Sequence, residues 1–284
     1  MSKLRAAIVS IALLALAGCS GAQILNATIP RGGYTIHKDI AYGTEPLQKL
    51  DIYVPEKKNG CTVLFFYGGS WQTGSKDMYL FAGQAFASLG CVTAVADYRR
   101  YPAVSFPVFV EDSARAAVWV HNHIAAYGGD AGKLFLAGHS AGAYNAMMLA
   151  ANTKFLRAAG GTAAWIKGVI GIAGPYDFLP MSDPKIIALF STAKDTETQP
   201  VTFVHKGMPP VFLATGDKDA DVLPRNSIRL KAKLEKTGNK IELHTYPGID
   251  HVGIITSLAP LFRTRTTLLQ DIGTFIRSRQ GKAD

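Results

Sequence analysis

Ser140 lies between two glycines at the end of a short apolar run, in the stretch KLFLAGHSAGA. The residues before the serine are apolar, as a buried parallel strand requires, and those after it favour helix. A strand, a sharp turn and a helix with G-x-S-x-G at the bend form the nucleophile-elbow pattern. The pattern alone is weak, because a small residue in a tight turn produces the same letters. Ser140 is therefore a candidate nucleophile that needs partners.

The base is the first partner that the chemistry requires. A serine hydroxyl is a poor nucleophile near neutral pH, so it needs a base, and the base needs an acid that orients it. On an elbow of this kind the acid and the histidine follow the serine, in that order. His244 lies inside the alternating segment IELHTY, and His205 precedes the strand expected to carry the acid. His251 follows a strand, where a loop can carry it over the sheet, so we expect it to be the base.

Three aspartates follow the apolar run of VFLATG: Asp217, Asp219 and Asp221. Their spacing also invites a calcium loop, but Val222 stands where such a loop needs glycine and Ile228 where it needs glutamate. The spacing G-x-x-D-x-x-V instead matches the acid loop of many serine esterases. We expect Asp219 to be the acid, with Asp217 as the alternative.

A serine nucleophile also requires hydrogen-bond donors to the oxyanion of the tetrahedral intermediate. Each well-placed donor lowers the activation free energy by roughly 3 kcal/mol in such enzymes. Ala141, directly after the nucleophile, offers one backbone N–H. A second should come from a glycine-rich loop after an earlier strand, and LFFYGGSW is in that place. Glycines there let the backbone approach a substrate. We expect Trp71 to pack this loop down or to line the pocket.

Strand-like and helix-like segments alternate along the chain. Strands are expected at 34–41, 49–54, 61–67, 91–97, 133–138, 167–173, 210–215 and 241–246. Helices are expected at 76–89, 107–126, 140–151, 224–237 and 260–279. This alternation predicts one α/β domain over 34–284, with a mostly parallel eight-stranded sheet and helices on both faces. The segment 174–205 is the one candidate for a cap, and it is short and polar. Ligands of such sheets bind at the carboxyl ends of the strands.

Composition excludes several classes of protein. Hydrophobic residues make up 48% of the 284 and charged residues 18%, so a sizeable core is expected. The formal net charge is +9, but the charges are scattered, which argues against a nucleic-acid partner. His121 and His123 are two residues apart on a predicted helix and share no face, so no metal site is expected. His139 is interpreted as structural.

The N-terminus combines a basic start, MSKLR, with a short apolar run that ends at Cys19. The run is too short to span a bilayer comfortably, which favours a cleaved signal. The letters LAGC resemble a bacterial lipoprotein lipobox, in which the cysteine carries the lipid. We therefore expect a signal peptide over 1–18, a tether over 19–33 and a lipid anchor at Cys19. Ser20, by the lipoprotein sorting rule, implies the outer membrane, with the domain facing the periplasm.

Cys61 and Cys91 each open an apolar run that predicts a buried parallel strand. If those strands are neighbours, both sulfur atoms lie at the same end of the sheet. An oxidising compartment would permit a disulfide. We expect two buried free thiols, with the disulfide as the alternative.

Six motifs follow one another at fitting distances: YGGSW…GSK, DYRRYPAVSFP, EDSARAAVWV, GGDAGKLFLAGHSAG, GPYDF and GDKDADV. In this order they resemble the carboxylesterases of the α/β-hydrolase superfamily over about residues 45–280. The nearest resemblance is to the HGGxW esterases, which include feruloyl-esterase-like (BD-FAE) enzymes, hormone-sensitive-lipase-like enzymes and kynurenine formamidase. The resemblance implies a triad of Ser140, Asp219 and His251. By motif position it implies oxyanion donors at the backbone N–H groups of Gly69, Ser70 and Ala141.

One residue departs from the family pattern. Tyr67 stands where the family usually has a histidine that supports the glycine loop, and we expect the tyrosine hydroxyl to substitute for it. The pocket is expected to be lined by Trp71, Tyr98, Tyr176 and Phe178, which favours small acyl or aromatic esters.

The leading hypothesis is therefore an envelope-anchored serine carboxylesterase that works without a cofactor on small-molecule esters. A kynurenine-formamidase-like hydrolase is the second enzyme hypothesis, although an envelope location fits poorly with cytosolic tryptophan breakdown. A catalytically silent binding module is the hypothesis from another class. The intact Ser140, Asp219 and His251 argue against that module. The sequence makes no prediction of the oligomeric state.

Overall fold

A single eight-stranded sheet organises the chain in a computed structural model that describes residues 21–280. The strand order is β1-β2-β4-β3-β5-β6-β7-β8, and β2 runs antiparallel to both of its neighbours while the other pairs are parallel. The strands are β1 Tyr34–Ala41, β2 Lys49–Pro55, β3 Thr62–Phe66, β4 Val92–Ala96, β5 Leu134–His139, β6 Ile166–Ile172, β7 Val211–Gly216 and β8 Ile241–Tyr246. All the expected strands are present, with ends that differ by at most one residue.

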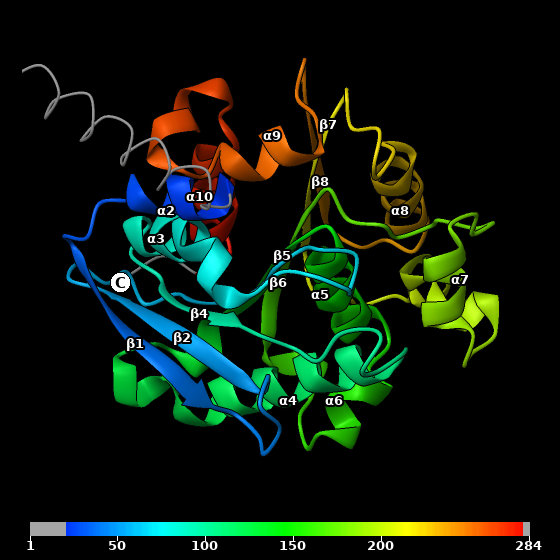
Figure 1. The fold of residues 1–284 in the computed structure, drawn as a ribbon, viewed down its shortest axis with the longest axis horizontal. Helices are drawn as coiled ribbons and strands as arrows, with labels where there is room; N and C mark the ends of the chain where they lie inside the picture. Colours follow the sequence, from blue (N-terminus) through cyan, green and yellow to red (C-terminus); the bar gives the residue numbers. More distant parts are fainter. Residues whose placement is uncertain (1–20, 281–284) are drawn as a thin grey trace, which may run out of the picture.

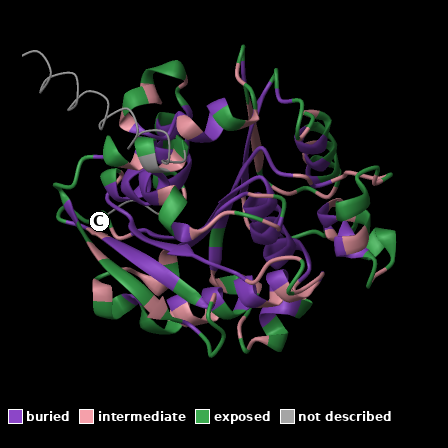
Figure 2. Cartoon of the chain, in the orientation of Figure 1, coloured by how far each residue is buried: buried purple, intermediate pink, exposed green. Residues whose placement is uncertain are grey.

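Burial explains why these segments are strands. Every residue of β3, β4, β5 and β7 is buried, as parallel strands covered on both faces must be. The outermost strands are the exception, because β1 and β8 consist mostly of half-buried or exposed residues. Figure 2 shows the buried strands in the middle of the molecule and exposed positions on the outer surfaces of the helices.

Helices cover both faces of the sheet (Figure 1). The longer ones are α3 Leu80–Ser88, α4 Val108–His123, α5 Ala141–Ala151, α8 Arg225–Lys236 and α10 Leu268–Arg277. α3 and α10 pack on one face, and α4, α5 and α8 pack on the other. The expected helix 76–89 begins as a 3-10 turn, Lys76–Tyr79, and 260–279 divides into a 3-10 segment, Pro260–Arg265, and α10.

Four short helices were not expected: α2 Gly21–Ala27, α6 Lys154–Ala158, α7 Pro184–Phe190 and α9 His251–Thr256. Each has seven residues or fewer, which is too short to display a helical hydrophobic period. Of these, α7 belongs to the connection between β6 and β7, where it forms the small cap. No helix in residues 21–280 is long and apolar enough to cross a membrane.

In the segment expected as a tether, residues 21–29 pack against the domain. Its helix α2 buries Leu25, and Ile29 beyond the helix is also buried in the core. The side chain of Asn26 donates a hydrogen bond to the backbone carbonyl of Asp77. The expected lipid site, Cys19, and the expected signal, 1–18, lie outside the described residues.

Cys61 and Cys91 form a disulfide, so the expectation of free thiols was wrong. They precede β3 and β4, which pair in parallel with Thr62 opposite Val92. The pairing brings the two Cα atoms to 4.6 Å, within the range that a disulfide spans. The bond lies at the amino ends of the strands, opposite the edge where ligands of such sheets bind.

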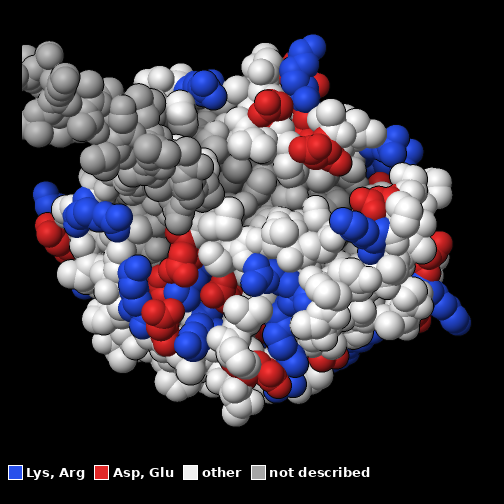
Figure 3. All heavy atoms as spheres, in the orientation of Figure 1, with Lys and Arg blue, Asp and Glu red and all other residues white. Residues whose placement is uncertain are grey.

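Positive and negative side chains are interspersed over the surface, and the middle of the face in Figure 3 is largely uncharged. On the part of that face formed by residues 21–280, acidic side chains lie among the basic ones.

Candidate active site

Ser140 lies on a strained turn between β5 and α5. Its backbone has φ 53° and ψ −122°, a conformation that L-residues rarely adopt. A Cβ on Gly142 would lie 2.0 Å from the carbonyl oxygen of Phe66, and a Cβ on Gly138 would lie 2.4 Å from the backbone of Gly142. Glycine is therefore required on both sides of the serine. This is the nucleophile-elbow geometry that the sequence predicted.

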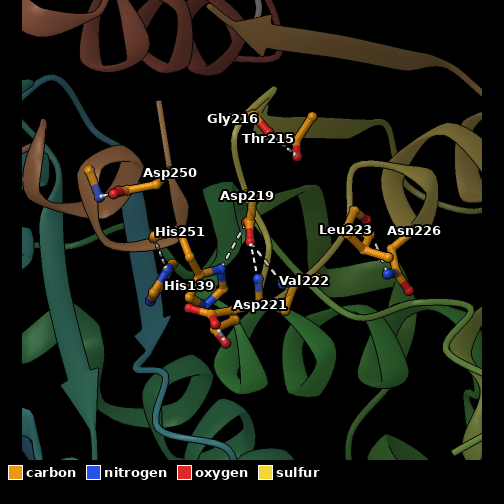
Figure 4. Close-up of polar contacts among 12 residues, drawn as sticks. His139, Thr215, Gly216, Asp219, Asp221, Val222, Leu223, Asn226, Asp250 and His251 are labelled. Carbon is orange, nitrogen blue, oxygen red and sulfur yellow. Dashed lines mark hydrogen bonds and ion pairs between the residues drawn. The ribbon is translucent and has the colours of Figure 1, made fainter. Parts of the chain in front are cut away.

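Three side chains from distant parts of the chain meet beside this elbow, and Figure 4 shows two of them, Asp219 and His251, joined by a dashed line. His251 Nε2 lies 2.9 Å from Ser140 Oγ, and His251 Nδ1 lies 2.8 Å from Asp219 Oδ2. Ser140 and Asp219 are buried, at 8% and 2% exposure, and the His251 side chain is 13% exposed. The imidazole therefore bridges the hydroxyl and the carboxylate, as the chemistry of a serine nucleophile requires.

The loop after β7 holds the Asp219 carboxylate in place. Oδ1 accepts hydrogen bonds from the backbone N–H groups of Asp221 at 3.1 Å and Val222 at 2.8 Å, which leaves Oδ2 for His251. Asp217, the alternative acid, accepts from the N–H of Gly248 instead. The structure thus brings Asp219, and not Asp217, to the imidazole.

His251 is the first residue of α9, not a loop residue as expected. The carboxylate of Asp250 caps this helix by accepting from the N–H of Gly253. A helix start fixes the backbone of the base more firmly than a loop would. The helix is only six residues long, so the sequence gives no periodic signal for it.

The backbone donors expected for an oxyanion line the same cavity as Ser140: Gly69, Ser70 and Ala141. Within residues 21–280 none of their three N–H groups makes a hydrogen bond. Gly69 has φ 133°, and a Cβ there would lie 2.3 Å from the carbonyl of Thr73. The loop is therefore a tight, preformed turn with unused donors at the cavity.

Tyr67 does not support this loop through its hydroxyl, so that expectation was wrong. The side chain is fully buried and stacks on Tyr98, and its hydroxyl makes no hydrogen bond to the loop. The Tyr98 hydroxyl donates to the carbonyl of Tyr67 at 2.8 Å, and the N–H of Gly68 donates to the hydroxyl of Tyr79 at 3.2 Å. Two other tyrosines therefore hold the strand end and the start of the loop.

A cavity of about 650 Å³ opens beside the triad. Its apolar wall comes from the glycine loop, the cap and the acid loop, and includes Trp71, Phe178, Met181, Ile186 and Leu223. Trp71 and Phe178 thus lie where the sequence placed them. Tyr98 and Tyr176 do not: both are completely buried and neither lines the cavity. Three charged residues also line the cavity, all of them exposed: Asp183, Asp221 and Arg225.

Two buried amides that sequence reasoning missed hold the cavity walls. Asn145 on α5 accepts from the indole N–H of Trp71 at 3.0 Å. Asn226 on α8 accepts from the backbone N–H groups of Tyr176 and Asp177, both at 3.0 Å, and so fixes the start of the cap. No local signal identifies such residues, because their partners are more than 45 positions away.

His139, interpreted as structural from the sequence, is buried beside the triad, and its ring centroid lies 4.8 Å from that of His251. Burial, with a smaller contribution from His251, lowers its pKa to about 3, so the ring is neutral near pH 7. Elsewhere in the described chain, no three histidine, cysteine, aspartate or glutamate side chains gather as metal ligands would.

The sheet order, the elbow and the position of the acid loop define the α/β-hydrolase fold. The structure superposes on esterase B from Lactobacillus rhamnosis with a TM-score of 0.77, at 19% identity, covering 99% of this chain and 98% of that one. The profile of the BD-FAE family matches residues 50–234, and the chain belongs to this family.

Curated relatives are similar at the level of sequence. A probable isoprenylcysteine alpha-carbonyl methylesterase of Oryza sativa subsp. japonica is 29% identical over 266 residues, covering 85% of this chain and 62% of the relative. A kynurenine formamidase of Danio rerio is 27% identical over 234 residues, covering 78% of this chain and 76% of the relative. The chain thus spans about three fifths of the length of the methylesterase.

Proposed function

We propose that the chain is a serine carboxylesterase that hydrolyses small-acyl or aromatic esters through an acyl-enzyme. One observation carries this proposal: the His251 ring lies within hydrogen-bond distance of both Ser140 Oγ and Asp219 Oδ2. Membership of the BD-FAE family and the esterase names among the relatives support it.

In the acylation step, His251 Nε2 takes the proton from Ser140 as Oγ attacks the ester carbonyl carbon. The carbonyl π electrons move to oxygen, where the N–H groups of the glycine loop and of Ala141 would stabilise the oxyanion. Asp219, held by two backbone N–H groups, keeps the proton on Nδ1 and stabilises the imidazolium. The tetrahedral intermediate then collapses, and His251 gives its proton to the departing alcohol.

Deacylation repeats these steps with water. His251 takes a proton from a water molecule, whose oxygen attacks the acyl carbon of the ester on Ser140. Collapse of the second tetrahedral intermediate releases the carboxylic acid and returns the proton to Oγ. The half-apolar cavity of about 650 Å³ suits a small or aromatic ester.

Turnover of p-nitrophenyl acetate by the purified full-length protein tests the proposal. We expect hydrolysis by the wild type, loss of turnover in Ser140→Ala, and attachment of a fluorophosphonate probe to Ser140. Equal rates in the wild type and the variant would overturn the esterase. Absence of labelling would favour the binding module of the same fold.

Hydrolysis of an aryl formamide is the second candidate, favoured by the kynurenine formamidase among the relatives. The same nucleophile and oxyanion donors would act on a formyl carbon. Comparing kcat/KM for N-formylkynurenine and p-nitrophenyl acetate separates the two activities. A higher value for the formamide would replace the leading proposal.

The site of action is proposed to be the cell envelope, with a lipid on Cys19 and the domain in the periplasm. The lipobox-like LAGC supports this location, as does the Cys61–Cys91 disulfide, since such bonds persist in oxidising compartments. Cys19→Ser should release the protein from the membrane fraction. Unchanged fractionation would remove the lipid anchor from the proposal.

A further inference from the structure

His139 joins the backbone of the base to a neighbouring tyrosine. It is the last residue of β5, directly before Ser140, and is 4% exposed. Its Nε2 lies 3.2 Å from the carbonyl oxygen of His251, and its Nδ1 lies 3.2 Å from the hydroxyl of Tyr79. Both ring nitrogens are therefore engaged with protein groups.

The chemistry of these groups fixes the direction of each hydrogen bond. A carbonyl oxygen only accepts, so Nε2 must carry a proton and donate it to His251. The ring is neutral, because burial lowers its pKa to about 3, so Nδ1 carries no proton and accepts from the Tyr79 hydroxyl. Burial raises the pKa of Tyr79 to about 12, which keeps that hydroxyl protonated.

The Tyr79 hydroxyl continues the chain of hydrogen bonds to the glycine loop. While it donates a hydrogen bond to His139, it accepts one from the N–H of Gly68 at 3.2 Å. Gly68 immediately precedes Gly69, one of the proposed oxyanion donors. The contact is close, since a Cβ on Gly68 would lie 2.8 Å from His139 Nδ1 and 2.9 Å from the Cβ of Ser140.

We propose that His139 and Tyr79 are positioning residues that fix the distance between the oxyanion loop and the catalytic base. The hydrogen bonds run from the Gly68 N–H to the Tyr79 hydroxyl, then to His139 Nδ1, and from His139 Nε2–H to the His251 carbonyl. This inference rests on the proposed esterase function. The pair connects two parts of the site that no covalent segment joins directly.

The arrangement assigns His139 no proton transfer. Both of its nitrogens are used in holding backbone and tyrosine, while His251 Nε2 is the nitrogen beside Ser140 Oγ. A ring that served only to fill space would be replaceable by another flat ring. A positioning ring is not replaceable in this way, because small displacements of reacting groups cost up to roughly a hundredfold in rate.

A double-mutant cycle on kcat and KM tests the proposal, with Tyr79→Phe, His139→Phe and the double variant assayed on p-nitrophenyl acetate. We expect kcat to fall roughly 10- to 100-fold in each single variant, with KM changed by less than about threefold. The double variant should be no slower than the slower single variant, because one chain of hydrogen bonds is broken in all three. Losses that multiply in the double variant would overturn the proposal.

Tyr34→Phe is the matched control. Like Tyr79→Phe, it removes a single tyrosine hydroxyl, which in this case donates to the backbone carbonyl of Pro30 from the outer strand β1. It should keep the wild-type kcat at a similar melting temperature. Wild-type kcat in Tyr79→Phe and His139→Phe, in a protein whose Ser140→Ala variant is inactive, would overturn the positioning role and leave the esterase intact. Wild-type rates in Ser140→Ala itself would overturn the esterase.

A spectroscopic measurement covers the case in which His139→Phe does not fold. In ¹⁵N-histidine-labelled wild type, one ring should be protonated at Nε2 alone and should not titrate between pH 5 and 8. That signal should shift in Tyr79→Phe. If instead every histidine ring titrates in this range, the proposal is wrong.

Discussion

Two clusters of charged and polar groups, each with buried members, lie in different parts of this molecule, and they differ in one respect. Around Lys76, the ammonium nitrogen lies 2.7, 2.9 and 3.2 Å from carboxylate oxygens of Asp39, Asp51 and Asp77. All three ammonium protons have a partner there. At the triad, Ser140 and His251 border an open cavity. Within residues 21–280, the nearby backbone N–H groups expected as oxyanion donors have no hydrogen-bond partner. A saturated cluster holds structure together, whereas an unsaturated one is available to a substrate.

The Lys76 cluster fastens the antiparallel edge of the sheet to the segment before α3. Asp39 belongs to β1 and Asp51 to β2, and the backbone N–H of Lys76 donates to Asp97, just beyond β4. Burial alone would lower the pKa of Lys76, but the hydrogen bonds that its ammonium donates to Asp39 and Asp51 outweigh burial and raise the pKa. The cluster should therefore affect stability and leave the chemistry unchanged.

The largest expected effect is a loss of activity when the triad is changed. Ser140→Ala should lower kcat by roughly 10⁴- to 10⁶-fold, because the nucleophile is lost. The free energy of unfolding, measured in urea, should stay close to that of the wild type. Ser182→Ala, which removes an exposed hydroxyl from the cavity wall, is the control and should be nearly as active as the wild type. A large loss of stability in Ser140→Ala would contradict the expectation that the triad affects activity and not stability.

The converse change is Lys76→Met. Lys76 and Asp51 form a buried ion pair, and removing the ammonium leaves the Asp51 carboxylate buried without a counter-charge, so the free energy of unfolding should fall by about 3–5 kcal/mol. The kcat of the folded fraction should stay within about twofold of the wild type, because the Lys76 side chain bonds aspartates outside the triad and Lys76→Met keeps the backbone N–H that ties the Tyr79 turn to Asp97. Lys38→Met, an exposed lysine of β1, should change stability by less than about 0.5 kcal/mol. Equal effects of both substitutions in urea titrations would show that the cluster contributes nothing.

The dependence of stability on pH tests a third buried group, the ring of His139. Its folded pKa of about 3 lies below the ordinary value of 6.5, so between these values the unfolded chain binds a proton that the folded chain does not. As far as His139 determines it, the free energy of unfolding should therefore be highest above pH 6.5. Below that pH it should fall by up to about 1.4 kcal/mol per pH unit. Burial raises the pKa of Asp97, which acts in the opposite sense, so the difference between wild type and His139→Phe is the quantity to measure. Parallel pH profiles for the two proteins would refute this assignment.

The smallest effect concerns the cavity wall. Phe178 packs against Phe190 at 5.5 Å between ring centroids and lines the cavity. Phe178→Ala should lower kcat/KM for p-nitrophenyl benzoate by roughly three- to tenfold relative to p-nitrophenyl acetate, because apolar contact is lost. Phe203→Ala, a half-buried ring outside the cavity lining, should leave this ratio unchanged. A ratio unaffected by Phe178→Ala would remove this ring from the binding site.

The sequence predicted strands, elbow and triad order because these depend on local composition and on what a serine nucleophile needs. Leu134–Leu136 and the bracketing glycines show a strand and a turn without reference to the rest of the chain. The partners of buried polar groups were not predictable. Asn145 and Trp71, or Tyr79 and His139, are 74 and 60 positions apart, and their side-chain types would also suit a surface.

The prediction that Tyr98 and Tyr176 line the cavity was wrong for the same reason. Tyr98 and Tyr176 follow strands at the edge where a substrate would bind, so their position along the chain suggested the cavity. Packing decided otherwise: Tyr98 turns inward to bond the carbonyl of Tyr67, and Tyr176 lies against Gly171 and Gly174. Which way a ring at a strand end turns depends on the space left by neighbours that the sequence does not reveal.

The position of the Cys61–Cys91 bond has a practical consequence for anyone handling this protein. The bond joins the residues before β3 and β4, whereas Ser140, Asp219 and His251 follow the carboxyl ends of β5, β7 and β8. Reducing agents therefore act at the opposite edge of the sheet from these three side chains. Reduction of the disulfide should lower the free energy of unfolding by about 3–4 kcal/mol, the usual contribution of a disulfide that closes a loop of some thirty residues. A reduced sample should therefore be stable in storage for a shorter time. Freshly reduced and oxidised preparations should nevertheless give the same specific rate, so either can serve for kinetics.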